Sequence, residues 1–210
     1  MKKSVSKSKI SNKTDSSDNL GRLIIFSAPS GCGKTTIVER LLKRHPDWVR
    51  SVSATTRLAR EGEKTGEDYF FVSEAEFRKL QEKEELLESA KVFDKHYGTP
   101  RSFVMDNIHQ GKSVVLAIDI QGTKSIQKAL GDQVDLITIF ILPPSIKVLR
   151  ERLEGRQTES SAQIDKRIQI AQDEIKEAGN YDFAVVNQNL DQTILEIEEK
   201  LDSLIQERRK

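Results

Sequence analysis

An eight-residue loop between an apolar run and an amphipathic stretch restricts the fold of this chain more than any other feature. The loop, Ala28-Pro-Ser-Gly-Cys-Gly-Lys-Thr35, follows a short β-branched and aromatic run, Arg22–Ser27, and precedes apolar positions that share one helical face. This order matches the strand–loop–helix context of the phosphate-binding pattern G-x-x-x-x-G-K-[ST]. Glycine dihedrals at Gly31 and Gly33 allow successive backbone N–H groups to point inward at a polyphosphate. The sequence therefore predicts a nucleotide-phosphate site.

Each position of the loop has a chemical reason. The following helix, expected over Lys34–Arg44, offers the unsatisfied N–H groups of its first turn and the positive end of its dipole. Lys34 supplies a mobile charge for the β and γ phosphates of ATP, and the Thr35 hydroxyl is the expected ligand of the accompanying Mg²⁺. Ala28 replaces the leading glycine, which is tolerable at negative φ. The predicted ATP-binding residues here are Ala28, Pro29, Ser30, Gly31, Cys32, Gly33, Lys34, Thr35 and Thr36.

The rest of the chain alternates between strand and helix patterns. Three further buried-strand runs cover residues 113–118, 136–142 and 183–187. Helical patterns separate and follow them, over residues 122–130, 145–153 and 161–178 and along a final stripe from Ile194 to Leu204. Such alternation implies right-handed crossovers and a parallel sheet with helices on both faces, an α/β fold.

One stretch breaks this alternation. Residues 51–105 contain short strand patterns over 51–55 and 69–72 and a charged helical pattern near 74–83, so we expect a small α+β insert there. The insert lies between the first helix and the second strand of the predicted core.

Composition and charge exclude several classes of protein. The chain has 210 residues, of which 36% are apolar and 32% charged, as in soluble globular proteins. Five lysines and two aspartates give residues 1–20 a net charge of +3, which leaves −2 for the remainder. The residues after position 20 therefore lack the basic stripe of a nucleic-acid-binding protein. No apolar run approaches the roughly 20 residues of a membrane span. We expect a disordered Lys/Ser-rich tail over 1–20, no nucleic-acid or membrane partner, and a reduced, cytoplasmic setting, given one cysteine.

Residues after the first helix carry a family resemblance. The segments Ser51-Val-Ser-Ala-Thr-Thr-Arg-Leu-Ala-Arg-Glu-Gly-Glu63 and Gly66-Glu-Asp-Tyr-Phe-Phe-Val72 resemble the substrate-binding insert of guanylate kinases. Further matching motifs follow in order: Glu88, Tyr97-Gly-Thr99, Asp119-Ile-Gln-Gly122, Pro143-Pro-Ser145 and Arg152-Leu-Glu-Gly-Arg156. The resemblance runs from about Arg22 to the last helix.

This resemblance implies a P-loop NTPase-type sheet with a GMP-binding insert and a helical lid. The implied activity is transfer of the γ-phosphoryl group of ATP to GMP or dGMP, by a monomer or homodimer. It divides a domain over residues 21–205 into three parts: a core over 21–50, 106–144 and 168–205, an insert over 51–105, and a lid over 145–167.

The resemblance also implies a GMP site within the insert. Guanidinium forks at Arg57 and Arg60 suit a phosphate monoester, and Glu63 would orient them. A carboxylate such as Glu88 can accept from the ring N–H and the amine of guanine together. The implied GMP-binding residues are Ser53, Arg57, Arg60, Glu63, Tyr69, Glu88, Tyr97, Gly98, Thr99 and Asp119.

Arginines of the lid are the candidates for transition-state charge. Phosphoryl transfer needs positioning and charge neutralisation more than covalent help, so a closing lid with arginines fits the chemistry. The predicted catalytic residues are Lys34, Arg60, Arg152, Arg156 and Arg167, and Asn187 is expected beside the adenine.

Two positions depart from the family pattern. Ala117 stands where an acidic residue usually precedes the aspartate of Asp-x-x-Gly, so Asp119 must act alone. Gln188 follows Asn187 where Asn-Asp is common, which predicts altered purine selectivity on the donor side.

Three alternatives compete with this interpretation: another small-molecule kinase of the superfamily, a non-enzymatic scaffold module, and a nucleotide-hydrolysing switch. Ser53, Glu88 and Thr99 argue against the first, and the intact Lys34 and Thr35 argue against the second. The third would need a water-positioning residue and no arginine-rich monophosphate site.

The lone cysteine, Cys32, lies at a helix N-terminus, where thiolates are favoured. We hypothesise that oxidants or alkylating agents inhibit the protein through Cys32, with a tolerated spacer as the simpler interpretation.

Overall fold

Strand β1 (Arg22–Ser27) lies at the centre of a five-stranded sheet in the computed structural model, which describes residues 20–92, 94–155 and 160–210. The strand order is β2-β7-β1-β8-β9, and every pair is parallel. The other strands of this sheet are β2 (Val49–Arg50), β7 (Val114–Ala117), β8 (Asp135–Leu142) and β9 (Phe183–Val186), and β1 pairs directly with β7 and β8. The α/β architecture predicted from the alternating pattern is confirmed.

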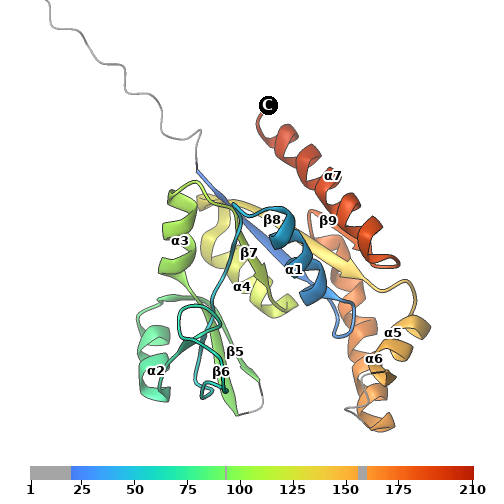
Figure 1. Cartoon of the computed structure of the whole chain (residues 1–210), viewed down its shortest axis with the longest axis horizontal. Coiled ribbons are helices and arrows are strands. Elements are labelled where there is room, and N and C mark those ends of the chain that lie inside the picture. The colour runs from blue at the N-terminus through green and yellow to red at the C-terminus, as the bar shows by residue number, and fades with distance from the viewer. Residues whose placement is uncertain (1–19, 93, 156–159) are drawn as a thin grey trace, which may run out of the picture.

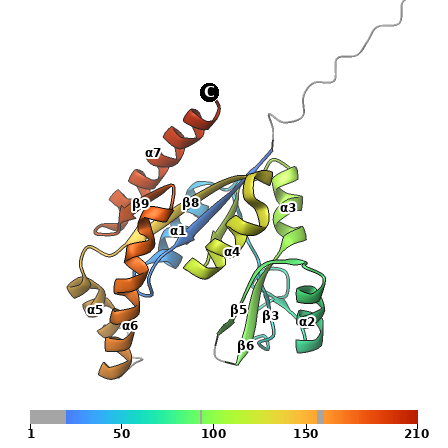
Figure 2. The ribbon, with the colours of Figure 1, turned by 180° about the vertical axis from the view of Figure 1, so that it is seen from behind.

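Both faces of this sheet are covered because consecutive side chains of β1 point to opposite sides. Ile24 and Phe26 belong to one buried cluster and Leu23 and Ile25 to another. The helices of the first face are α1 (Lys34–Arg44), α5 (Ile146–Glu154), α6 (Ser161–Ile175) and α7 (Leu190–Arg208). The second face is covered by α3 (Arg101–His109) and α4 (Ile120–Leu130), and the two sides can be compared in Figures 1 and 2.

Short 3₁₀ segments end two of these helices. They are η2 (Gly131–Gln133), after α4, and η3 (Lys176–Asn180), after α6. Within the described ranges, no helix combines the length and the apolar content needed to cross a membrane.

A second sheet of four strands lies beside the core, in the order β4-β3-β6-β5. Its elements are β3 (Ala54–Thr55), β4 (Phe70–Phe71), α2 (Glu74–Glu82), β5 (Leu86–Val92) and β6 (Lys95–Pro100). A capping box fixes the start of α2: the Ser73 hydroxyl accepts from the Glu76 N–H, and the Glu76 carboxylate accepts from the Ser73 N–H. The β5–β6 antiparallel pair, α3 and β2 are elements that the sequence pattern did not predict.

Two lobes project from the same side of the core. Both ribbon views place the small sheet with α2 in one lobe and the α5–α6 pair in the other (Figures 1 and 2). The loop after β1, the turn after β7 and the segment after β9 all follow carboxyl ends of parallel strands. Ligands of open α/β sheets bind at that edge.

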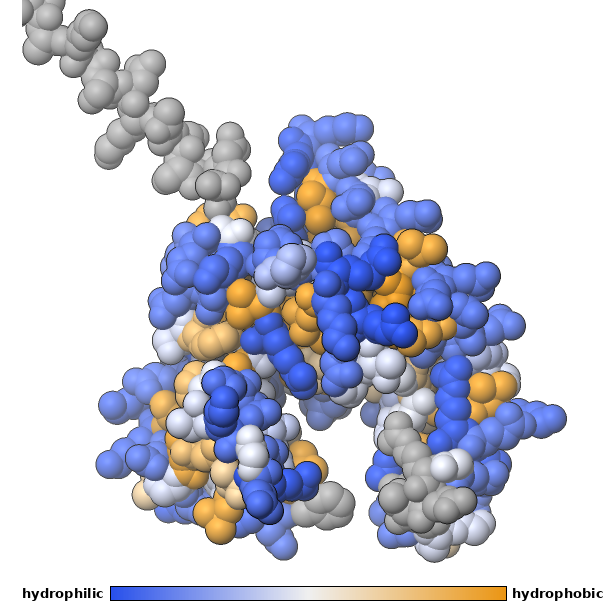
Figure 3. Space-filling model, viewed as in Figure 1, coloured by the Kyte–Doolittle hydropathy of each residue, from blue (hydrophilic) through white to orange (hydrophobic). Residues whose placement is uncertain are grey.

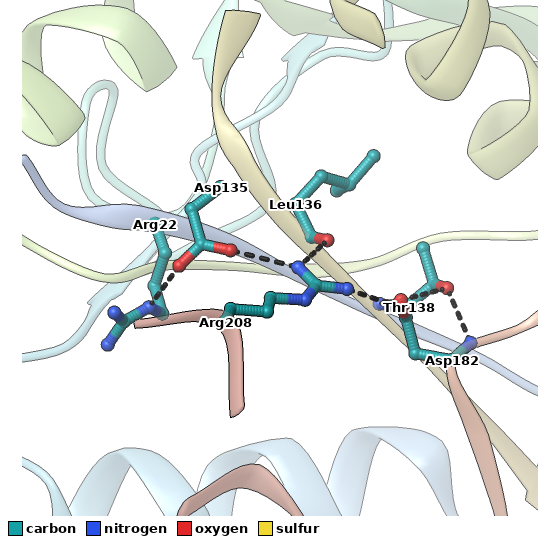
Figure 4. A network of polar contacts seen from close by, with 6 residues as sticks. All are labelled: Arg22, Asp135, Leu136, Thr138, Asp182 and Arg208. Carbon is teal, nitrogen blue, oxygen red and sulfur yellow. Dashed lines mark hydrogen bonds and ion pairs between the residues drawn. The ribbon is translucent and has the colours of Figure 1, made fainter. Parts of the chain in front are cut away.

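A cluster of hydrogen bonds around Arg208, which we call the clasp, lies at the opposite edge of the sheet, where the strands begin (Figure 4). Arg208, the last residue of α7, donates to Asp135 Oδ1 at 2.9 Å and to the Leu136 carbonyl at 2.7 Å, and also to Asp182. Arg22 donates to the other oxygen of Asp135 at 2.9 Å. These hydrogen bonds lower the pKa of Asp135, against the opposing effect of its burial. The clasp ties the end of α7 to the first strand of the sheet.

Replacing the central guanidinium should loosen this clasp. We expect Arg208→Ala to lower the free energy of unfolding by about 1–2 kcal/mol, because several acceptors at a partly buried strand edge lose their donor. In thermal unfolding this corresponds to a fall in Tm of roughly 2–6 °C. Arg209, the next residue, is exposed and provides the matched control. Arg209→Ala should leave Tm unchanged. Equal Tm values for the two variants would show that the clasp contributes no stability.

Candidate active site

The loop after β1 has the backbone conformation that its glycines predict. Gly31 and Gly33 have φ values of +94° and +88°. Gly33 is also constrained by a close approach, since a Cβ there would lie 2.5 Å from Asn187 Nδ2. The Asn187 amide donates to the Cys32 carbonyl at 2.8 Å, which fixes the loop against the segment after β9. Only glycine satisfies both conditions at position 33.

Helix α1 begins directly after this loop with an N-terminus that no side chain caps. Its N-cap residue is Gly33, and its first turn contains no acidic residue. The first turn therefore keeps its N–H groups and positive dipole end for an external anion. The predicted residues Thr35 and Thr36 are exposed in this turn.

Lys34 extends from α1 across the carboxyl edge of the sheet. Its Nζ donates to the Ile118 carbonyl at 2.6 Å, at the end of β7. Burial lowers the pKa of Lys34, while the nearby carboxylates of Asp119 and Glu174 raise it. The carbonyl of Ile118 was not among the predicted site groups, because a main-chain acceptor leaves no trace in a sequence motif.

Two of the predicted lid arginines contact the loop or its support. Arg167 NH1 of α6 donates to the Ser30 hydroxyl at 2.6 Å. Arg152 NH2 of α5 donates to the Asn187 carbonyl at 2.8 Å. Arg156, the third predicted arginine, lies outside the described residues, as do 157–159. Through these two contacts the α5–α6 lobe is attached to the phosphate loop and to the segment after β9.

Asn187, which is predicted beside the adenine, also contacts the back of the phosphate loop. Its side chain is buried, and its amide is used by the Cys32 carbonyl. The Thr193 hydroxyl lies 3.5 Å from Asn187 Oδ1. The residue supports the loop from behind in this conformation.

The insert holds a preorganised arginine. Arg57 NH1 and NH2 donate to the two carboxylate oxygens of Glu63 at 2.9 and 2.8 Å. This hydrogen-bonded pair raises the pKa of Arg57 and lowers the pKa of Glu63 to about 2. The guanidinium also stacks near the Tyr69 ring, 5.2 Å from its centroid. Such a pair stays charged at physiological pH, so a fixed cation lies in the insert.

The other predicted phosphate-site residues lie around this pair. The Arg60 N–H donates to Glu63 Oε2 at 2.7 Å, and the Arg60 side chain is exposed. Tyr69 and Tyr97 pack edge to face with centroids 5.9 Å apart. Glu63 thus binds the Arg57 side chain and the Arg60 main chain, while Tyr69 lies beside the Arg57 guanidinium and packs against Tyr97.

A carboxylate–hydroxyl pair lies on the neighbouring strands. The Thr99 hydroxyl donates to Glu88 Oε1 at 2.6 Å, and Thr99 is fully buried. Burial raises the pKa of Glu88, and the negative charge of Asp119 raises it further. Gly98 allows this arrangement because a Cβ there would lie 2.9 Å from Leu86 Cδ1 and 3.0 Å from the Glu88 carbonyl. Gly98 thus contributes by allowing β5 and β6 to pack closely.

The two halves of the site meet at the first turn of α4. Asp119 caps this helix by accepting from the Gly122 N–H at 2.7 Å. Glu88 reaches the same turn, since a Cβ on Gly122 would lie 3.4 Å from Glu88 Oε2. The ammonium of Lys34 contacts the residue just before Asp119. The Lys34 ammonium and the Glu88 carboxylate thus both lie at the first turn of α4.

An open hollow separates the two lobes below this turn. Figure 3 shows it between the lobe of the small sheet and the lobe of α5 and α6. Two ligands can therefore enter from the same side before any closure.

Comparison with known proteins agrees with this geometry. The family model described as guanylate kinase matches residues 20–204, which is most of the chain. The chain belongs to the guanylate kinase family. The predicted family is confirmed, and with it a phosphotransferase that binds nucleotides and phosphorylates GMP with ATP.

Individual guanylate kinases resemble the chain over nearly their whole length. The guanylate kinase of Wolbachia sp. subsp. Brugia malayi (strain TRS) is 46% identical over 185 residues, covering 88% of this chain and 94% of the relative. That of Caldanaerobacter subterraneus subsp. tengcongensis is 44% identical over 177 residues, 84% of each chain. The crystal structure of guanylate kinase from Anaplasma phagocytophilum superposes with a TM-score of 0.67 at 36% identity, covering 88% of this chain and 86% of that one.

The hypothesis of a reactive thiol at Cys32 is wrong for this conformation. The side chain is fully buried within the cluster that includes Ile24 and Phe26. Burial raises the pKa of the thiol to about 12, which outweighs the lowering effect of the Arg152 charge. A helix N-terminus favours a thiolate only where the sulfur can reach it from solvent-accessible space.

We therefore expect the protein to resist thiol reagents in its folded form. Iodoacetamide at neutral pH should leave Cys32 unmodified and activity unchanged, whereas unfolding in urea should expose the thiol to full labelling. Intact-mass spectrometry measures the labelling directly. Rapid alkylation of the native protein, accompanied by loss of activity, would contradict the burial argument.

Proposed function

We propose that ATP binds on the phosphate loop while GMP binds in the insert, with the transferring phosphoryl group near the first turn of α4. The observation that supports this most strongly is the convergence of Lys34 and Glu88 on that turn. An acceptor held by its base at Glu88 and a donor held by its phosphates at Lys34 then meet across the hollow. Positioning of this kind converts a bimolecular reaction into an effectively unimolecular one.

The phosphate of GMP is assigned to the arginines and tyrosines of the insert. Glu63 holds Arg57 in place through two hydrogen bonds, so little side-chain entropy is lost when the phosphate arrives. Arg60, held at its main chain by the same carboxylate, adds an exposed guanidinium. The hydroxyls of Tyr69 and Tyr97 complete the proposed set.

The guanine base is assigned to the second half of the insert. Glu88 accepts from the ring N–H and the exocyclic amine, the hydroxyl of Ser53 is placed at the keto oxygen, and the Thr99 hydroxyl orients Glu88 by donating to it. Adenine leaves the Glu88 carboxylate without these donors, and a half-buried charge without partners is costly. Because the assigned contacts are to base and phosphate, we propose dGMP as a second substrate. Gly98 and Asp119 are assigned to the same site.

The α5–α6 lobe is proposed as the lid that closes over ATP. Arg152 and Arg167 already contact the loop or its support, and we assign them, with Arg156, to the developing charge of the transferred phosphoryl group. Closure also excludes water, which would otherwise compete with GMP for the phosphoryl group.

A Mg²⁺ ion carried in with ATP fits the donor set of the loop. The Thr35 hydroxyl is an exposed hard oxygen in the first turn of α1, the type of ligand that Mg²⁺ accepts alongside phosphate oxygens and water. When bound, this ion supplies neutralisation of the phosphate charge. Lys34 supplies the protein's own charge at the same phosphates.

We further propose a cytoplasmic protein that acts as a monomer or homodimer and divides as the resemblance implied. That division gives a core over 21–50, 106–144 and 168–205, an insert over 51–105 and a lid over 145–167. The single buried thiol and the use of ATP support a reducing compartment.

Loss of the loop lysine tests the proposed donor site. Lys34→Ala should lower kcat by at least about 10²–10³, because a charge that stabilises the transferring phosphoryl group is removed. GMP affinity, measured by calorimetry, should stay within about threefold, since its assigned contacts lie in the insert. An unchanged kcat would refute the role of Lys34.

Neutralising the proposed base contact tests the acceptor site. Glu88→Gln should reduce the preference for GMP over AMP by about 10- to 100-fold, because an amide cannot accept from two guanine donors at once. ADP formation with GMP, dGMP and AMP in turn measures this ratio. In the wild type the raised pKa of Glu88 has a further consequence: GMP affinity should fall as the pH drops through that pKa, where the carboxylate protonates.

The loss of GMP affinity at low pH should be absent in Glu88→Gln. A variant with the wild-type ratio of GMP to AMP turnover would remove Glu88 from the base site.

A further inference from the structure

Two consecutive threonines, Thr55 and Thr56, precede Arg57, and the proposed GMP site gives neither of them a role. Thr55 is fully buried, and Thr56 is 7% exposed. Burying a hydroxyl costs free energy unless it is hydrogen-bonded, and valine would fill the same space in a strand without that cost. The contacts of both hydroxyls must therefore account for threonine at these positions.

Both hydroxyls bond to the main chain of His96, the residue before Tyr97 on β6. The Thr55 hydroxyl donates to the His96 carbonyl at 3.0 Å. The Thr56 hydroxyl accepts from the His96 N–H at 3.0 Å, and the Thr56 N–H donates to the same carbonyl at 3.1 Å. These bonds extend the antiparallel pairing of β3 with β6, in which Thr55 lies opposite Tyr97. The end of β3 is thus fixed to the strand that carries Tyr97.

The Thr55 hydroxyl also contacts Arg57. The Arg57 N–H donates to Thr55 Oγ1 at 3.2 Å. Because β3 ends at Thr55, this N–H lies beyond the strand pairing, and the side chain two residues earlier serves as its acceptor. One buried hydroxyl therefore joins the main chain of Arg57 to the main chain of His96.

This contact complements the pair between Arg57 and Glu63. The two hydrogen bonds to Glu63 fix the guanidinium relative to its own segment, because Glu63 lies only six residues further along. They do not set where that segment starts relative to β6. The Thr55 hydroxyl does so, since it bonds to both sides of the junction.

We propose that Thr55 is a positioning residue for GMP binding, whose hydroxyl sets the position of Arg57 relative to Tyr97. This inference rests on the proposed function, in which Arg57 and Tyr97 bind the GMP phosphate. A phosphate held by side chains from two segments requires a fixed spacing between those segments, and buried hydrogen bonds behind the site supply it.

The first test is Thr55→Val, which removes the hydroxyl and keeps the branched shape. We expect KM for GMP to rise roughly tenfold, because the Arg57 N–H loses its acceptor and the guanidinium is no longer held at one position. The kcat and the KM for ATP should stay within about threefold of wild type, since a contact made equally in the ground and transition states affects KM alone. Steady-state ADP formation by the full chain measures all three. An unchanged KM for GMP, or an equal rise in the KM for ATP, would overturn the inference.

Two further variants separate the hydroxyl from general stability. Thr55→Ser retains the hydroxyl and should keep KM for GMP within about twofold of wild type. This variant also decides the question if Thr55→Val folds poorly, because a tenfold rise in Thr55→Ser would overturn the inference. Thr138→Val removes another buried hydroxyl, which donates to Asp182 at 2.8 Å, and should keep the wild-type KM for GMP. An equal rise in Thr138→Val would show that lost stability alone explains the effect at Thr55.

A double-mutant cycle between Thr55 and Arg57 tests whether the hydroxyl acts through the arginine. If it does, Thr55→Val changes KM for GMP by less than about twofold in a chain that already carries Arg57→Ala. A purely structural role would raise KM by the same factor in both backgrounds.

The failure of this inference can be distinguished from the failure of the proposed function. Independent effects of the two substitutions, with a raised KM for GMP in Arg57→Ala, would overturn the inference and leave the proposed GMP site in place. A wild-type KM for GMP in Arg57→Ala would overturn the proposed role of Arg57 and this inference with it.

Discussion

The parallel pairing of β1 with β7 on one side and β8 on the other is the constraint on which the active site depends. Ile25 pairs with Leu116 and with Thr138, so three strands run in register toward one edge. The phosphate loop leaves this edge after β1, and the N-cap of α4 leaves it two residues after β7. Their separation is therefore fixed by backbone hydrogen bonds, and Lys34 can span it with a single contact to a main-chain carbonyl.

Positive charge is fixed in place at the two sites where we propose that phosphate binds. In the core the charge is partial, from the first turn of α1, which carries neither a side-chain cap nor an acidic residue. In the insert it is a full charge on Arg57, held by two hydrogen bonds to Glu63. Holding these donors in place before binding reduces the reorganisation that phosphoryl transfer requires.

Strong local patterns made much of the fold predictable from the sequence. The bounds expected for β1 and α1 agree with the structure, because an apolar run ends at a glycine-rich loop and an apolar stripe ends before Pro46. The β5–β6 pair was missed because its residues, such as Glu88 and Lys91, have little strand preference, and the strands form through pairing and close packing at Gly98. Strand β2 is two residues long, too short for any periodicity.

Site residues were predictable where the type of side chain alone suggests the chemistry. Contacts that arise only from the packing of distant elements were not predictable. Arg57 pairs with Glu63, and Thr99 donates to Glu88, so these side chains interact in the structure, while their roles toward GMP stay predictions. The support of the loop by Asn187 and the burial of Cys32 depend on how β9 and α7 pack, which no local pattern records.

The Arg208 clasp also bears on how the molecule can be handled in experiments. Through Asp135, the clasp links the end of α7 to the start of β1, at the edge of the sheet opposite the phosphate loop (Figures 1 and 4). A fluorophore or a surface-coupling group attached after Lys210 would leave the path between the lobes unobstructed. The proposed closure of the α5–α6 lobe can then be followed on an immobilised molecule.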